Sequence, residues 1–169
     1  MGRYRPPAPK TSPYITPEGY RALQQESKEL WIRRSGVTKA LAAAAAEGDR
    51  SENAEYIYRK KELREIDRRI HYLQKRLPTL KVVHEAPAEG RRIFFGARIT
   101  LESEAGDELV YRIVGADEMD PKRGHISMDS PMARALLKKS VDDEVSVGTP
   151  NGEMFYRVVG VDYNPSVAE

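Results

Sequence analysis

The chain has 169 residues, of which 40% are apolar and 32% are charged, and its formal net charge is +2. No apolar segment approaches the ~20 residues that cross a bilayer, and the first residues lack the apolar core of a secretory signal. The absence of cysteine excludes disulfides, thiol nucleophiles and thiolate metal sites, and it fits a cytoplasmic protein.

Residues 1–13 contain four prolines and several basic residues, and they are predicted to form a flexible leader whose role the sequence leaves open. A helix is expected to follow, with Thr16 as its N-cap and Pro17 at its first position. Gly36 costs this helix about 1 kcal/mol relative to alanine and leaves open a flexible joint. Residues then recur at alternating steps of three and four, the spacing of a coiled-coil seam. The seam positions are Tyr20, Leu23, Ser27, Leu30, Arg34, Val37, Leu41 and Ala44.

A second series with the same spacing follows and stops at Pro78, because a proline ring does not fit inside a helix. Its positions are Tyr56, Arg59, Leu63, Ile66, Ile70, Leu73 and Leu77. Gly48 interrupts the chain between the two series, so residues 14–85 are predicted to fold back as an antiparallel helical hairpin. About thirty residues of helix give an arm of roughly 45 Å.

The spacing of apolar residues changes after the segment 85–90. Three segments alternate or are rich in β-branched residues, as strands are: 93–103, 107–119 and 125–130. Ser130 and Pro131 predict the start of a short helix with Lys138 and Lys139 in its last turn. Residues 144–163 predict a hairpin with a type I′ turn at Asn151-Gly152. Residues 86–169 are therefore expected to form an antiparallel sheet that carries one short helix.

The connection between the two helices is unusually acidic, since Glu47, Asp49, Glu52 and Glu55 lie within ten residues. Acids at a helix start complement its N-terminus and cap its free amides, which is one explanation. The alanines at 42–46, however, make the end of the arm slender, and the second helix is strongly basic. An acidic point on a basic helix suits a protein that guides a phosphodiester chain toward metal-assisted chemistry.

The acidic tip does not make a complete hydrolytic site. Mg²⁺ takes about six oxygen ligands and binds weakly to one or two exposed carboxylates. His71, His84 and His125 are far apart in the sequence and lack the spacing of metal ligands. If the tip takes part in chemistry, it must complete the active site of another protein.

Three motifs carry a resemblance to a known family: "GDRSENAEY" at 48–56, "KKELREIDRRIHYL" at 60–73 and "ISMDSPMARALLKK" at 126–139. With these motifs in this order, the chain resembles the Gre family of bacterial transcript-cleavage factors over residues 15–163. The resemblance implies an α+β protein with an N-terminal antiparallel coiled-coil hairpin and a C-terminal FKBP-like antiparallel β-sheet domain with a short helix. It also implies a protein that is not itself an enzyme. The hairpin is expected to enter the secondary channel of bacterial RNA polymerase, which then cleaves backtracked nascent RNA in its own active centre.

The resemblance also assigns roles to single residues. Asp49 and Glu52 match the catalytic acids of the family, which are implied to hold a Mg²⁺ ion shared with the polymerase and to orient the attacking water. No tightly bound cofactor, membrane or small-molecule substrate is expected. The other matched residues are Asn53, Glu55 and Tyr56, which shape the tip; Lys60, Arg64 and their neighbour Arg68, which bind the RNA 3′ segment; and Asp129, Ser130 and Pro131, which contact the rim helices of the polymerase.

Three other functions remain open from the residues. A secondary-channel regulator that inhibits the polymerase without cleavage has no need of the Asp49 and Glu52 pair. A prolyl isomerase, suggested by the FKBP-like shape, needs a deep aromatic pocket, whereas Trp31, the only tryptophan, lies on the hairpin. A general RNA-binding or chaperone hairpin explains the basic residues and leaves the acidic tip without a purpose.

Overall fold

The computed structural model describes residues 10–48 and 53–163, and the chain divides into two compact units. One unit is Tyr20–Leu80, and the other combines Met1–Gly19 with Lys81–Glu169. The structure therefore assigns residues 14–19 and 81–85, which the sequence placed with the hairpin, to the unit that contains the sheet. Among the described residues, no helix has the length and apolar character needed to cross a membrane.

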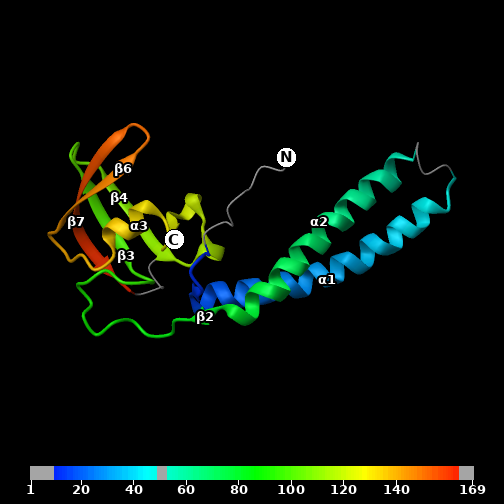
Figure 1. The fold of residues 1–169 in the computed structure, drawn as a ribbon, viewed down its shortest axis with the longest axis horizontal. Coiled ribbons are helices and arrows are strands. Elements are labelled where there is room, and N and C mark those ends of the chain that lie inside the picture. Colours follow the sequence, from blue (N-terminus) through cyan, green and yellow to red (C-terminus); the bar gives the residue numbers. More distant parts are fainter. Residues whose placement is uncertain (1–9, 49–52, 164–169) are drawn as a thin grey trace, which may run out of the picture. The chain divides into compact units, whose positions relative to one another are not determined.

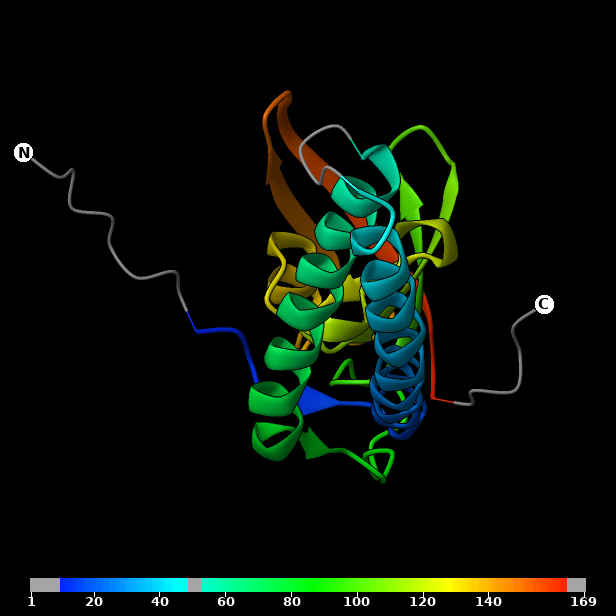
Figure 2. The same ribbon diagram turned by 90° about the vertical axis from the view of Figure 1, so that its right-hand side faces the viewer.

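Two long helices make up the first unit, and they lie side by side (Figures 1 and 2). They are α1 (Pro17–Ala45) and α2 (Ala54–Arg76). The predicted start of α1 is confirmed, because the Thr16 hydroxyl oxygen accepts a hydrogen bond of 3.1 Å from the Gly19 amide. The helix is continuous through Gly36.

The end of α2 is also as predicted. The helix finishes at Arg76 and passes into a 3₁₀ turn, Leu77–Thr79, which contains Pro78. Basic side chains, Lys75 and Arg76, occupy its last turn, where they complement the negative end of the helix dipole.

The predicted seam is confirmed, since every seam position on both helices is buried or half-buried. Its centre is a small apolar cluster of Val37, Ile66 and Ile70, against which Leu30 and Leu63 pack. The charged seam residues are accommodated by pairing: Arg34 donates from Nε to Asp67 at 2.6 Å, and Arg59 binds carboxylates of its own helix. Two antiparallel helices thus bury one narrow stripe each and expose the rest.

The second unit contains a five-stranded sheet in the order β5-β4-β3-β7-β6. Its strands are β3 (Arg98–Ser103), β4 (Glu108–Val114), β5 (His125–Ser127), β6 (Glu144–Thr149) and β7 (Gly152–Asp162). All neighbours are antiparallel except β4 and β5, which run parallel. The sheet is therefore mixed, which the sequence did not predict. Two 3₁₀ turns, Ala116–Glu118 and Pro121–Arg123, carry the chain back so that β5 pairs with Arg112–Val114, the last residues of β4.

The core of this unit lies on one face of the sheet. Alternate residues of β3, Ile99 and Leu101, are fully buried, as the period of two in a strand requires. The short helix α3 (Pro131–Leu136) contributes Ala133 and Leu136 to the same cluster. This helix begins as predicted, with Ser130 as N-cap.

Two element boundaries and one turn differ from the prediction. Helix α3 ends at Leu136, and Lys138 has a φ of 70°, so the two lysines lie beyond the helix. Strand β3 begins only at Arg98, because Gly96 turns the chain with a φ of 87°. The β6–β7 turn is not type I′, since Gly152 has a positive φ and Asn151 does not. Thr149 pairs with Gly152, so the two central residues of the turn are Pro150 and Asn151, and a proline φ fixed near −65° does not fit the positive φ that a type I′ turn requires.

Glu118 binds the start of α1 within the second unit. Its carboxylate accepts hydrogen bonds from the Thr16 amide at 3.0 Å, from the Thr16 hydroxyl and from the Gly115 amide at 2.8 Å. Gly115 is required here, because a Cβ at that position would lie 2.3 Å from the Tyr14 carbonyl oxygen. The strands β1 (Tyr14–Ile15) and β2 (Lys81–Val82) pair in parallel beside this contact.

Replacing Glu118 with alanine tests this contact. Thr16 is buried, so Glu118→Ala leaves its polar atoms without acceptors and is expected to lower the free energy of unfolding by about 1–3 kcal/mol. Urea unfolding of the full chain, followed by circular dichroism, measures the change. Glu104→Ala, which removes an exposed carboxylate of the same unit, is the control and is expected to stay within about 0.5 kcal/mol of the parent. Equal losses in both variants would contradict the assignment.

Candidate functional site

The ends of the two helices meet through one side chain, that of Asn53. Its Oδ1 accepts a hydrogen bond of 3.1 Å from the Tyr56 amide, which makes Asn53 the N-cap of α2. Its Nδ2 donates at 2.8 Å to the carbonyl oxygen of Ala44, in the last turn of α1. Asparagine supplies an acceptor and a donor at once, so one residue satisfies groups on both helices. The two helix ends are therefore joined beside the acidic connection.

The two predicted catalytic acids, Asp49 and Glu52, lie outside the described residues. Their position in the chain is between Gly48, which follows the end of α1 with a φ of 130°, and the capping Asn53. Of the other tip residues, Glu55 is exposed and accepts a hydrogen bond of 2.7 Å from Arg59. Tyr56 is half-buried at the seam, with the Lys60 ammonium 5.8 Å from its ring centre.

Two groups of basic residues on the hairpin differ in their contacts. The first group forms ion pairs with carboxylates: Arg33 with Glu62, Arg34 with Asp67, Arg59 with Glu55 and Glu62, and Arg69 with Glu26. The second group is the predicted RNA-binding set of Lys60, Arg64 and Arg68, all exposed, for which the described residues provide no ion pair. The structure brings these three together on α2, because their spacing of four residues places them one turn apart.

The paired group has clear electrostatic effects. The hydrogen bond from Arg33, reinforced by Arg59, lowers the pKa of Glu62, and Glu55 and Glu62 together raise the pKa of Arg59. The Glu62 carboxylate thus stays ionised and neutralises its arginine partners. Exposed bases without an ion pair among the described residues, Lys60, Arg64 and Arg68 among them, keep positive charge that can meet an anion.

The loop predicted to contact the polymerase has a partner within the chain. The Asp129 carboxylate accepts a hydrogen bond of 2.9 Å from the Ser12 amide and another from the Ser12 hydroxyl. Asp129 also donates its own amide to the Ser127 hydroxyl at 3.1 Å. The sequence does not predict this role of Ser12, because residues 1–13 have the composition of a flexible leader and no local pattern marks this serine. The contact fixes the Asp129 carboxylate beside the start of α3.

The ion pairs across the hairpin were missed as well, although a signal for them exists. Glu26 and Arg33 flank seam positions on α1, and Glu62 and Arg69 flank seam positions on α2. These are the places where charged pairs commonly join coiled-coil helices.

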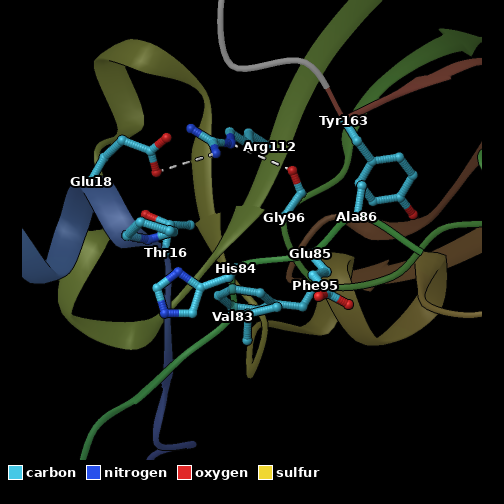
Figure 3. A pocket seen from close by; sticks show the side chains of 11 residues that line it. Thr16, Glu18, Val83, His84, Glu85, Ala86, Phe95, Gly96, Arg112 and Tyr163 are labelled. Carbon is cyan, nitrogen blue, oxygen red and sulfur yellow. Dashed lines mark hydrogen bonds and ion pairs between the residues drawn. The ribbon is translucent and has the colours of Figure 1, made fainter. Parts of the chain in front are cut away.

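A small pocket in the second unit is lined by residues of several segments (Figure 3). Arg112 extends toward it, between Glu18, which lies 3.8 Å from its Nη2, and the Gly96 carbonyl, 3.5 Å from its Nε. Phe95 and Tyr163 are the aromatic residues of the lining. Charged groups therefore occupy much of this pocket, in contrast to the deep aromatic pocket that a prolyl isomerase needs.

The described residues contain no group of three or more side chains that could hold a metal ion. Burial, together with the charges of Arg123 and Arg112, lowers the pKa of His125, so this side chain favours its neutral form.

The sequences of both parts of the chain match those of known proteins. The family model described as "Transcription elongation factor, N-terminal" matches residues 13–82, and "Transcription elongation factor, GreA/GreB, C-term" matches residues 88–163. The chain is 59% identical over 165 residues to the transcription elongation factor GreB of Xanthomonas axonopodis pv. citri, covering 96% of this chain and 98% of that protein. It is 56% identical to GreB of Pseudomonas aeruginosa, covering 98% and 99%.

Among solved structures, GreA factor homolog 1 (Gfh1) of Thermus thermophilus is 29% identical, covers 88% of this chain and 97% of its own, and has a TM-score of 0.41. The sequence matches place the protein among the transcription elongation factors. Within that class, the chain belongs to the GreA/GreB family. The resemblance to the Gre family, and within it to GreB, is confirmed.

Replacing Asn53 tests the joint between the helix ends. Asn53→Ala removes the cap of α2 and the bond to Ala44, and we expect it to lower the free energy of unfolding by about 1–2 kcal/mol. Asn53→Asp keeps the capping oxygen and loses only the Nδ2 donor, so its loss should be smaller. Thermal melting followed by helical circular dichroism measures both. An alanine variant as stable as the parent would show that this residue does not join the helices.

Proposed function

We propose that this protein rescues backtracked RNA polymerase by stimulating the polymerase's own Mg²⁺-dependent cleavage of the nascent RNA. The observation that carries the proposal is the place of Asp49 and Glu52 in the chain. Both lie in the short connection between two long antiparallel helices whose ends are joined by Asn53. A hairpin of this kind delivers carboxylates into a channel that a compact domain cannot enter. Membership of the GreA/GreB family supports the same function.

Asp49 and Glu52 are suitable ligands for Mg²⁺, but two carboxylates are too few to complete its coordination. Carboxylate oxygens are preferred ligands of this ion, and two carboxylates leave most of its six positions to be filled by others. The chain therefore acts on an ion that the polymerase also holds, and it is not an enzyme by itself. An ion held in this way would supply the positive charge that phosphodiester cleavage needs in its transition state. Asp49 and Glu52 help to hold this ion and orient the attacking water.

The exposed bases of α2 have a separate task. Lys60, Arg64 and Arg68 project from the helix that begins at the acidic connection, and they carry charge that no described carboxylate neutralises. A phosphate chain close to the tip neutralises this charge. In the proposed function these residues hold the 3′ segment of RNA that backtracking extrudes into the secondary channel.

The second unit provides a contact outside the channel. Asp129, Ser130 and Pro131 lie at the start of α3, where Ser12 fixes the carboxylate and the Ser130 hydroxyl caps the helix. A fixed carboxylate costs little side-chain entropy when a partner binds it. We assign this loop to the rim helices of the polymerase.

Removing either acid tests the chemical role. Asp49→Asn or Glu52→Gln should leave binding to the polymerase intact and reduce stimulated RNA cleavage by ~10²-fold or more, if one carboxylate is worth ~3 kcal/mol in the transition state. The measurement is the rate of transcript shortening in stalled, backtracked elongation complexes with Mg²⁺. Glu47→Gln is the matched control, since it removes one negative charge from the same connection and should cleave normally.

Two outcomes would count against this role. If Asp49→Asn and Glu52→Gln stimulate RNA cleavage at the rate of the parent, the two acids have no part in the reaction. A parent protein that binds the complexes and blocks them without cleaving RNA would indicate the inhibitory regulator instead.

Removing the unpaired bases tests the RNA contact. Lys60→Ala and Arg64→Ala should each weaken crosslinking to the extruded RNA and reduce the salt slope of its binding by ≈ 1. Lys75→Ala removes an exposed cation near the far end of the same helix and serves as the control. An equal fall in crosslinking in all three variants would indicate a general effect of net charge. Crosslinking that is unchanged by Lys60→Ala and Arg64→Ala would refute the assignment.

A further inference from the structure

Trp31 is the only tryptophan of the chain, and 47% of its surface is exposed in the middle of α1. Trp31 is not a seam residue, so the packing of the two helices does not explain why a tryptophan occupies this position. The indole is the largest aromatic side chain, and leaving half of it in water forgoes a substantial hydrophobic gain. Neither the fold nor the proposed cleavage mechanism uses this residue.

The contacts of Trp31 place it on a particular side of the hairpin. The guanidinium of Arg34 lies 5.9 Å from the centre of the indole ring, and its Nε donates to Asp67 on α2 at 2.6 Å. Arg64 precedes Asp67 by three residues, so the two share a side of α2, and Lys60 lies one turn further toward the tip. Trp31 on one helix and the unpaired bases on the other therefore face the same side.

The opposite side of the hairpin has a different character. There Arg33 pairs with Glu62 and Arg69 pairs with Glu26, so the charges cancel. On the side of the hairpin that carries Trp31, the Asp67 carboxylate is neutralised by Arg34. Lys60 and Arg64 are left positive beside an exposed indole.

An exposed aromatic ring among cations that lack carboxylate partners is the combination by which proteins bind single-stranded nucleic acid. The aromatic face stacks on a base while the cations meet the phosphates, and such stacking does not depend on sequence. Double-stranded nucleic acid offers no free base face to an isolated indole. The charge and the ring together therefore favour single-stranded RNA as the occupant.

We propose that Trp31 is a base-stacking site for single-stranded RNA. A base of the extruded 3′ segment stacks on the indole, Lys60 and Arg64 bind the flanking phosphates, and Arg34, fixed by Asp67, holds the ring. This inference rests on the proposed function, which brings RNA to the hairpin. Trp31 precedes the end of α1 by fourteen residues, or roughly 20 Å. Only RNA extruded by several nucleotides reaches it.

The single tryptophan makes a direct test possible, because stacking of a base quenches indole fluorescence. The full-length protein is titrated at low salt with an unstructured RNA of about ten nucleotides, and saturable quenching of Trp31 is expected. Anisotropy of labelled RNA measures affinity independently. Trp31→Leu should weaken binding by roughly ten-fold. Tyr58→Leu, which removes an exposed aromatic residue of the other helix, α2, is the control and should bind as the parent does.

Three results would overturn the inference. The first is RNA binding that does not quench Trp31 fluorescence, the second is equal RNA affinity of the parent and Trp31→Leu, and the third is the lack of saturable RNA binding at low salt. Lys60→Ala combined with Arg64→Ala should move the quenching curve to higher RNA concentrations, and an unmoved curve would also contradict the arrangement.

A second arm separates this inference from the proposed function. Backtracked elongation complexes with short and with long extruded RNA are cleaved in the presence of the parent or Trp31→Leu. We expect the variant to be several-fold slower on long extrusions at limiting protein and unchanged on short ones. Slower cleavage on both would identify Trp31 as a contact with the polymerase and refute RNA stacking. If the parent stimulates no cleavage at all, the proposed function fails, while the fluorescence result still decides the stacking.

Discussion

The narrow seam between α1 and α2 is the constraint on which the rest of the hairpin depends. A pair of helices buries only one stripe of each, and here the centre of that stripe is three apolar residues, Val37, Ile66 and Ile70. Most of each helix surface is therefore exposed and must be polar or charged. Salt bridges across the seam fix the register, because Arg33 and Arg69 each reach a glutamate on the other helix. The abundance of charge follows from the thinness of the core.

Pairing then decides which charges are available for binding. Carboxylates of the hairpin are used mainly by arginines at the edges of the seam, and this leaves Lys60, Arg64 and Arg68 exposed on α2. A net charge of +2 gives no sign of this separation, because it sums over paired and unpaired groups alike. The local excess of positive charge is what attracts a phosphate chain, and it lies on the helix that starts at the acidic connection.

Contacts distant in sequence fix the second unit. Ser12 binds Asp129, and Glu118 binds Thr16, each across more than a hundred residues. Both contacts use a carboxylate as an acceptor for an amide and a hydroxyl of the same partner residue, a strong arrangement because the acceptor is charged. They hold the residues before α1 against the turns that connect the strands. The loop at the start of α3 thereby acquires a fixed carboxylate.

The sequence by itself determined the elements that repeat regularly. Local patterns and motifs can be recognised in a single sequence. They predicted the seam spacing, the caps at Thr16 and Ser130, the stop at Pro78 and the membership of the Gre family. Tertiary structure alone decided the parallel pairing of β5 with β4, the contact of Ser12 with Asp129, and the link from Trp31 through Arg34 to Asp67 on the other helix. Each of these joins residues far apart in the chain, and no local spacing encodes which distant groups folding brings together.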